Sequence, residues 1–136
     1  MNIRNVKFFE GIDPTVVEEI SSVCKSRSYA AKDVIFEKGA AAGHLYILKS
    51  GSVELLLRKT DNIVYGLETP GEIFGWSSIV ENGVYTSTAT CVTETDVLSI
   101  SKNDIEGIFN RHTDAAVTFY RRLGSIVSKR ITRAVE

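Results

Sequence analysis

The chain has 136 residues, of which 43% are hydrophobic and 24% are charged, and its formal net charge is −1. Such a chain forms one globular domain that can bury a core without disulfide or metal support. A charge this close to zero gives no general attraction to nucleic acid or to an anionic membrane. The N-terminal residues lack the apolar run of a signal peptide, and no stretch reaches membrane-spanning length. We therefore expect one cytoplasmic domain over residues 1–136.

A short helix is predicted near the N-terminus. Asp13 can cap it, and Pro14 suits the first helical position, where a backbone N–H is not needed. Val16 and Ile20 then fall on one apolar face that continues to about Cys24.

From about residue 26 to residue 100 the pattern changes to short strands. The apolar runs are rich in β-branched and aromatic residues and occur at 34–36, 45–48, 53–57 and 97–100. Turn signals separate them at 37–39, 49–51, 60–62 and 69–72. No alternation of strands with helices occurs, which argues against a doubly wound parallel sheet. The prediction is a mainly β fold with flanking helices: an antiparallel β-roll of the jelly-roll type, or double-stranded β-helix.

The pattern after Ser101 is helical again. A short helix is expected from residue 103 to residue 109, and Thr113 or Asp114 then caps a long one over about 113–135. Its apolar residues recur in steps of three and four, which is the spacing of a coiled-coil seam. We expect a homodimer through this seam, formed by Val117, Tyr120, Gly124, Val127 and Ile131. Phe119 and Ile126 lie on another side of the helix and can cover the roll.

The long helix is also basic. Residues 113–136 contain five bases and two acids, a net charge of +3, so the rest of the chain carries −4. Arg122, Lys129 and Arg133 project to a side that is expected to face solvent. The favoured interpretation is a solvated helix face whose cations complement the helix C-terminus.

Three motifs in chain order carry a resemblance to a known family. EKGAAAGHLYILKSGSVEL at 37–55 has two glycine turns around a strand, because Gly39 and Gly51 can take positive φ. TPGEIFGW at 69–76 is similar to the opening of a phosphate-binding cassette, and TATCVTETDVLSI at 88–100 resembles the strands that follow it. Together with the flanking helices, the chain resembles the cyclic-nucleotide-binding domains of catabolite-activator and anaerobic-regulator proteins. The resemblance implies a ligand-sensing β-roll with a C-terminal dimerisation helix.

The cassette departs from the pattern of the nucleotide-binding members. Those members have a glutamate directly after Phe-Gly, which holds the ribose, and an arginine before Ala-Thr or Ala-Ser, which neutralises the cyclic phosphate. In the cassette of this chain, Trp76 stands at the glutamate position and Thr86 or Ser87 at the arginine position. A buried anion without that arginine loses a charge-assisted pair commonly worth more than ~1.5 kcal/mol. We therefore expect cAMP and cGMP to bind weakly or not at all.

Two interpretations of the altered cassette remain open. Its hydroxyls and backbone N–H groups can still hold a ligand, especially where a short helix begins at Ser77. Alternatively, Trp76 fills the vacated space and the hydroxyls satisfy one another. The candidate cassette residues are Phe74, Gly75, Trp76, Ser77, Ser78, Thr86, Ser87 and Thr88, and the candidate helix contacts are Ser128 and Thr132.

Other chemistry has little support in the sequence. His44 and His112 lack acidic or cysteine partners at metal-ligand spacing, and the two cysteines, Cys24 and Cys91, read as buried free thiols. No nucleophile, P-loop or dinucleotide motif occurs, so we predict neither an enzyme nor a cofactor or metal site. No recognition helix follows the long helix, so specific nucleic-acid binding is not expected. The predicted function is a regulatory module that senses a small-molecule ligand. The alternative is a closed-pocket module with no small-molecule ligand, which binds a partner protein or dimerises.

Overall fold

The computed structural model describes residues 1–58, 63–80 and 83–135, with side chains for 1–57, 64–80 and 83–130. The helical elements are the 3-10 helices η1 (Ile3–Asn5), η2 (Lys7–Phe9) and η3 (Trp76–Ile79) and the α-helices α1 (Pro14–Val23), α2 (Lys102–Arg111) and α3 (Thr113–Val135). The strands are β1 (Lys25–Tyr29), β2 (Val34–Phe36), β3 (His44–Ser50), β4 (Val53–Arg58), β5 (Ile63–Leu67), β6 (Ile73–Phe74), β7 (Thr88–Cys91) and β8 (Thr95–Ser101).

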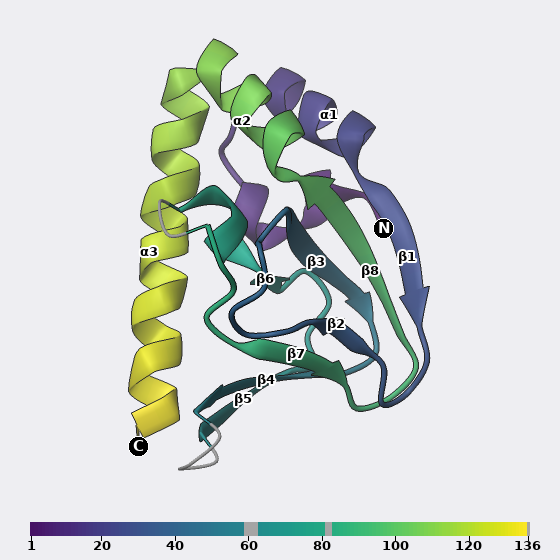
Figure 1. Cartoon of the computed structure of the whole chain (residues 1–136). Coiled ribbons are helices and arrows are strands. Elements are labelled where there is room, and N and C mark those ends of the chain that lie inside the picture. The colour runs from purple at the N-terminus through teal and green to yellow at the C-terminus, as the bar shows by residue number, and fades with distance from the viewer. Residues whose placement is uncertain (59–62, 81–82, 136) are drawn as a thin grey trace.

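The strands form two four-stranded sheets in which every pairing is antiparallel. One sheet has the order β1-β8-β3-β6 and the other the order β2-β7-β4-β5. Figure 1 shows α3 running along one side of this roll, with α1 and α2 together at one end. The predicted class is confirmed: a mainly β antiparallel roll with a short N-terminal helix and a long C-terminal helix.

The central strand β3 explains how the roll and the helices share one core. Leu45 and Ile47 point to a cluster that also contains buried residues of α1, α2 and α3. Tyr46 and Leu48 point the other way, into a cluster between the two sheets. Because successive side chains of a strand face opposite sides, a strand covered on both sides reads as a continuous apolar run. This is the LYIL run that marks β3 in the sequence.

The turn after β3 requires glycine at position 51. Gly51 has φ of +96°, and a Cβ atom built on it would lie 2.4 Å from the carbonyl oxygen of Glu94 and 2.8 Å from the Cα of Thr95. Gly39 also has positive φ, at +89°, but a Cβ atom there would meet no heavy atom within 4 Å. Both positive φ values confirm the prediction from the sequence. The two glycines differ in that Gly51 is also required by close packing.

The two shorter helices follow their capping signals closely. The carboxylate of Asp13 accepts a hydrogen bond from the Thr15 backbone N–H at 2.9 Å, and Pro14 is the first residue of α1, as predicted. Helix α2 begins slightly earlier than expected, at Lys102. Its cap is the Ser101 hydroxyl, which accepts from the backbone N–H of Asp104 at 3.1 Å. A serine at the end of β8 therefore stops the strand and starts the helix.

The face of α3 that covers the roll is apolar at its start. Phe119 and Leu123 are buried and Ile126 is partly buried against the same cluster, which confirms the covering role predicted for Phe119 and Ile126. The expectation of a solvated basic side is wrong for Arg122, which is half-buried and donates to the carbonyl of Phe8. Arg130, which that expectation does not include, is 7% exposed. Both lie among core-facing positions, so their charges act inside the molecule.

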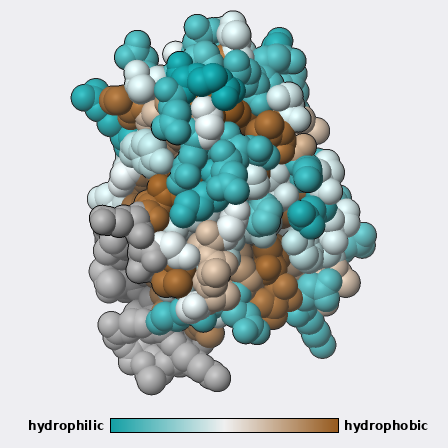
Figure 2. All heavy atoms as spheres, turned by 45° about the horizontal axis from the view of Figure 1, so that its top comes forward, coloured by the Kyte–Doolittle hydropathy of each residue, from teal (hydrophilic) through white to brown (hydrophobic). Residues whose placement is uncertain are grey.

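The two cysteines are free thiols, as expected, but only Cys91 is buried and Cys24 is half-buried. Burial raises the pKa of the Cys24 thiol to about 11. Within the described residues, no helix has the length and apolar character to cross a membrane. Figure 2 shows mostly hydrophilic residues over the end formed by α1 and α2, with small hydrophobic spots between them.

Candidate functional site

The first half of the cassette is a tight turn between β6 and η3. Gly75 adopts the left-handed conformation at the N-terminal cap of η3, with φ of +76°. The Ser78 backbone N–H and hydroxyl both donate to the Gly75 carbonyl, at 3.3 and 3.1 Å. Ser77 and Ser78 are buried, whereas Trp76 remains partly exposed. The predicted short helix exists, but it begins at Trp76 and its Ser78 hydroxyl is already hydrogen-bonded to the backbone.

The second half of the cassette approaches and enters β7. Thr86 is exposed, and Ser87 and Thr88 are half-buried. The Thr88 hydroxyl accepts a hydrogen bond from the backbone N–H of Lys38 at 3.0 Å. The hydrogen bonds of Ser78 and Thr88 thus lead to backbone groups and hold the turns around the cassette.

A cation reaches the cassette from α3. The Arg130 guanidinium lies 4.6 Å from the ring centroid of Trp76 and 5.1 Å from that of Tyr65. It also donates a hydrogen bond to the backbone carbonyl of Ile73 in β6. Guanidinium groups over aromatic rings at this range are attracted by the negative ring faces, most strongly where water is excluded. Arg130 therefore connects α3 to both sheets of the roll, through β6 and η3 on one side and β5 on the other.

The interior beside the cassette is filled by aromatic rings. Tyr85 stacks on Phe36 with ring centroids 3.9 Å apart, and Tyr46 stacks on Phe74 at 5.3 Å. The Tyr85 hydroxyl donates to the backbone carbonyl of His44 at 2.9 Å. Burial raises the pKa of Tyr46 and of Tyr85, so both phenols stay neutral. These four side chains offer hydroxyl groups and ring faces and carry no charge.

A groove runs along the other side of Arg130. It has a volume of about 780 Å³ and lies between η2, α3 and the segment that joins β5 to β6. Its walls include apolar residues and charges of both signs, and the three groups Tyr65, Ile73 and Arg130 form part of its lining. The candidate cassette residues do not line this groove. The guanidinium of Arg130 therefore separates an open groove from the cassette turn.

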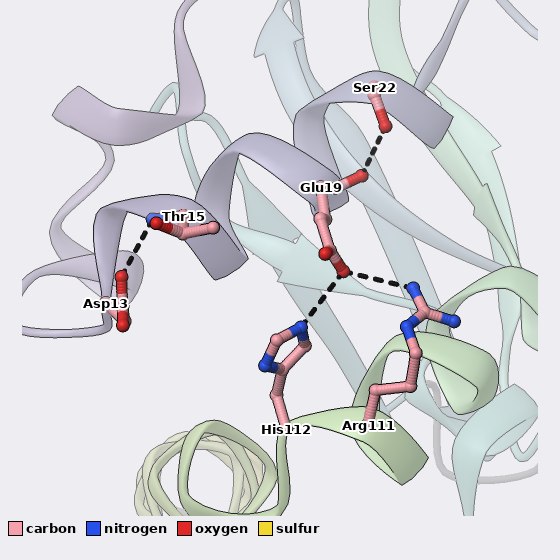
Figure 3. A network of polar contacts seen from close by, with 6 residues as sticks. All are labelled: Asp13, Thr15, Glu19, Ser22, Arg111 and His112. Carbon is pink, nitrogen blue, oxygen red and sulfur yellow. Dashed lines mark hydrogen bonds and ion pairs between the residues drawn. The ribbon is translucent and has the colours of Figure 1, made fainter.

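The start of α3 is fixed to α1 by a polar network (Figure 3). The Glu19 carboxylate of α1 accepts from Arg111 at 3.0 Å and lies 3.2 Å from Nε2 of His112. Hydrogen bonds from Arg111 and then His112 lower the pKa of Glu19. His112 ends α2, and its carbonyl accepts from the Ala116 backbone N–H of α3 at 3.1 Å. The junction of α2 and α3 is thus held at one carboxylate.

The outward side of α3 carries much of the predicted dimer seam. Val117 is 51% exposed and Tyr120 is 39% exposed, Gly124 is exposed and Val127 is half-buried. The side chain of Ile131 lies outside the described residues. Tyr120 is not free of the monomer, because its hydroxyl donates to the carbonyl of Ile79 at 3.3 Å and its ring packs on Phe109.

Among the candidate helix contacts, Ser128 is exposed and the side chain of Thr132 lies outside the described residues. The residues that sequence reasoning missed are Arg130 and Tyr65. A signal for Arg130 was present, since it follows Phe119, Leu123 and Ile126 in steps of four, three and four. That spacing places the arginine on the helix face that covers the roll.

Comparison with known proteins agrees with this architecture. Residues 26–112 match the cyclic nucleotide-binding domain family. The chain is 27% identical over 134 residues to the cyclic AMP receptor protein of Thermus thermophilus, covering 97% of this chain and 60% of that protein. A cAMP-activated global transcriptional regulator of Mycobacterium tuberculosis is 27% identical over 97 residues, covering 70% of this chain and 43% of that protein. The chain thus spans less than two thirds of the length of these relatives.

Solved structures give the same result. The Thermus thermophilus catabolite activator protein superposes with a TM-score of 0.72 at 26% identity, over 93% of this chain and 59% of that one. A Geobacter metallireducens structure assigned to cyclic nucleotide binding superposes with a TM-score of 0.83 at 23% identity, over 95% of both chains. The matched segment contains all of the roll except the first residue of β1, together with α2, and it covers more than half of the chain. The chain belongs to the cyclic nucleotide-binding domain family.

Proposed function

We propose that this chain is a regulatory ligand-sensing domain whose output is the position of α3. The observation that carries the proposal is the Arg130 guanidinium between Trp76 and Tyr65. A ligand that occupies the space beside Trp76 changes the surroundings of that guanidinium. Because Arg130 belongs to α3, ligand binding and helix packing are then coupled, which is what a sensor requires. The relatives named as cAMP-activated regulators support a regulatory role.

We further propose that cAMP and cGMP bind weakly or not at all. Enclosing a cyclic phosphate costs several kcal/mol of desolvation unless cations or N–H donors replace its water. The cassette supplies hydroxyls at Thr86 and Ser87 but no positively charged side chain. Arg130 is a cation nearby, but its guanidinium faces two rings and donates to a backbone carbonyl. A nucleotide phosphate has to replace those contacts before it can use the charge.

The coupling is tested by hydrogen exchange of the α3 backbone amides. Trp76→Ala should increase exchange of amides in the half of α3 around Arg130, because one stacking partner of the guanidinium is lost. Val92→Ala is the matched control, since Val92 is an exposed apolar side chain on a turn of the roll. Unchanged exchange of α3 in Trp76→Ala would show that the cassette and the helix are independent.

Nucleotide binding is tested by calorimetry with cAMP and cGMP. We expect no dissociation constant in the low micromolar range for the unchanged chain. Trp76→Glu combined with Ser87→Arg restores both missing charges and should create or strengthen binding. The control combines Trp76→Gln with Ser87→Gln, which changes size without adding charge. Low-micromolar binding of cAMP by the unchanged chain, or no gain from the charged pair, would contradict the proposed defect.

A second candidate function is a closed-pocket module that dimerises or binds a partner protein. It is favoured by the contacts that the Arg130 guanidinium already makes with Trp76 and with Tyr65. A screen of small molecules by thermal shift separates the two functions. A true ligand at a hundred times its dissociation constant adds about 2.7 kcal/mol to the free energy of unfolding. If the pocket is closed, no compound in the screen should raise the free energy of unfolding in this way.

A further inference from the structure

The surroundings of Arg130 have the chemistry of a receptor for a flat cation. The roll supplies two ring faces, from Trp76 in η3 and Tyr65 in β5, and a carbonyl oxygen, from Ile73 in β6. A guanidinium is planar and delocalised, so its faces stack on rings while its edge donates hydrogen bonds. Ring faces and carbonyl oxygens both carry partial negative charge. These three groups attract a cation and disfavour an anion.

From this geometry we infer that Trp76, Tyr65 and the Ile73 carbonyl form a recognition site for the guanidinium group. Arg130 occupies the site in this structure as a built-in ligand. A guanidino compound from solution replaces it and releases α3 from the roll. The inference rests on the proposed function only in its second part, where replacement of Arg130 becomes a movement of α3.

The site can be reached from solvent along the groove. Tyr65, Ile73 and Arg130 all line that groove, whose volume of about 780 Å³ lies within the usual range for small-molecule sites. A ligand therefore does not have to cross the core. The other charged residues of the lining are Lys7, Glu10, Glu72, Arg122 and Lys129, so polar groups of either sign on the body of a ligand meet a partner.

Arg130 competes with any external ligand because it is tethered. A tethered group acts at an effective concentration in the millimolar range, without the cost of a second molecule binding. A free guanidinium compound should therefore bind the unchanged chain poorly. Removal of the Arg130 side chain should reveal the site, and this difference makes the inference testable.

The experiment titrates Arg130→Ala with ethylguanidine, which supplies the atoms lost beyond Cβ. N-ethylurea has the same shape without the charge and is the matched control ligand. Trp76 is the single tryptophan of the chain, so its fluorescence reports on this site alone. We expect ethylguanidine to change the Trp76 emission of Arg130→Ala in a saturable way and to raise its melting temperature. The unchanged chain should need at least about a tenfold higher ethylguanidine concentration for the same response. N-ethylurea should change neither the emission nor the melting temperature.

Two further variants make the result specific. Tyr65→Leu in the Arg130→Ala background should lose most of the ethylguanidine response, because one ring face is gone. Arg121→Ala removes an exposed arginine of the same helix and should respond like the unchanged chain. Equal responses of Arg130→Ala to ethylguanidine and N-ethylurea would overturn the inference. So would a full response that persists without Tyr65. If Arg130→Ala does not fold, Arg130→Gln keeps much of the stem and is titrated in the same way.

The two parts of the inference fail differently. At saturating ethylguanidine, backbone amides of α3 in the unchanged chain should exchange faster with solvent. Suppose that Arg130→Ala binds ethylguanidine but that amide exchange of α3 in the saturated unchanged chain does not change. That result would support the recognition site and contradict the proposed sensing output. If neither Arg130→Ala nor Arg130→Gln binds ethylguanidine, the recognition site itself is contradicted, whatever the exchange of α3 shows.

Discussion

The Arg122 guanidinium of α3 donates a hydrogen bond of 2.6 Å to the backbone carbonyl of Phe8 in η2. This bond joins the first residues of the chain to its last helix. We expect Arg122→Ala to lower the free energy of unfolding by about 1.5–3 kcal/mol, the usual range for a hydrogen bond from a charged group. Urea denaturation measures it. Arg121→Ala, at the exposed neighbouring position, should change the value by less than about 0.5 kcal/mol. Equal effects of the two substitutions would mean that the bond adds no stability.

Gly51 should be far less tolerant of substitution than Gly39. Both have positive φ, so alanine costs about 1–2 kcal/mol at either position. At Gly51 the added Cβ also collides with the Glu94 carbonyl, whereas at Gly39 it enters open space. We expect Gly51→Ala to cost at least about 2 kcal/mol more than Gly39→Ala, through backbone displacement. Thermal unfolding of the two variants checks the difference. Matching melting temperatures would show that the β3–β4 turn relaxes around the methyl group.

Stability should fall as the pH is lowered from 7 to 5, and His44 should be one cause. Burial, with Arg27 and Lys25 adding positive charge nearby, lowers the pKa of His44 from 6.5. The unfolded chain then binds a proton that the folded chain does not, so stability is fully present above about 6.5 and is lost below it. The lowered pKa of Glu19 acts at lower pH, below 4.5. His44→Gln should flatten the dependence of unfolding free energy on pH between 7 and 5. NMR titration of the imidazole should give a pKa under 6.5, and a value above it would contradict the assignment.

The chain should form a homodimer through the outward side of α3. Val117 and Tyr120 expose apolar surface there, and Gly124 allows close approach of a second helix. Val117→Glu should give a folded monomer, because that side chain is exposed in the single chain, and its melting temperature should no longer depend on protein concentration. Arg121→Glu is the control for added negative charge at an exposed position. Light scattering at tens of micromolar protein measures the mass. A monomeric mass for the unchanged chain would contradict the dimer.

Specific DNA binding is not expected from the chain alone. Arg122 and Arg130 are engaged within the monomer, so fewer bases of α3 remain available to phosphates than the sequence suggests. Any affinity for duplex DNA should be weak, indifferent to sequence and steeply reduced by salt. Fluorescence anisotropy with unrelated duplexes at low and near-physiological salt checks this. Selective binding that survives near-physiological salt would contradict the prediction.

The fold could be predicted because its apolar runs and turns are explicit in the sequence. Strands β3, β4 and β8 read as apolar runs since they line covered surfaces, and the glycine turns mark their ends. Strand β1 could not be found in this way. Its sequence KSRSY is almost entirely exposed, and it exists because its backbone pairs with β8 along the sheet edge. Pairing with a distant strand leaves no local pattern in such a segment.

The candidate site could be predicted only in part. The absence of the two charged residues stays a prediction from the resemblance, which aligns Trp76 with the glutamate position and Thr86 or Ser87 with the arginine position. The place of Arg130 is indicated only by its spacing from Phe119, Leu123 and Ile126, and an arginine at such a position is usually exposed, so the spacing alone does not predict its burial. Tyr65 reaches the site through the pairing of β5 with β4, which brings the ring beside a helix about sixty residues away. That contact depends on tertiary geometry rather than on local sequence.

Because α3 is anchored at its N-terminal end, a small rotation there produces a large displacement farther along the helix. Its N-terminal end is held at Glu19 through Arg111 and His112, and Arg130 lies 18 residues beyond His112. At 1.5 Å per residue, Arg130 is roughly 27 Å from this pivot. A rotation of about 10° at the pivot moves the guanidinium by roughly 5 Å, given that helix rise. A displacement of that size would take the guanidinium out of contact with both rings, which lie 4.6 and 5.1 Å away, so this contact is sensitive to a small change of angle at the α2–α3 junction.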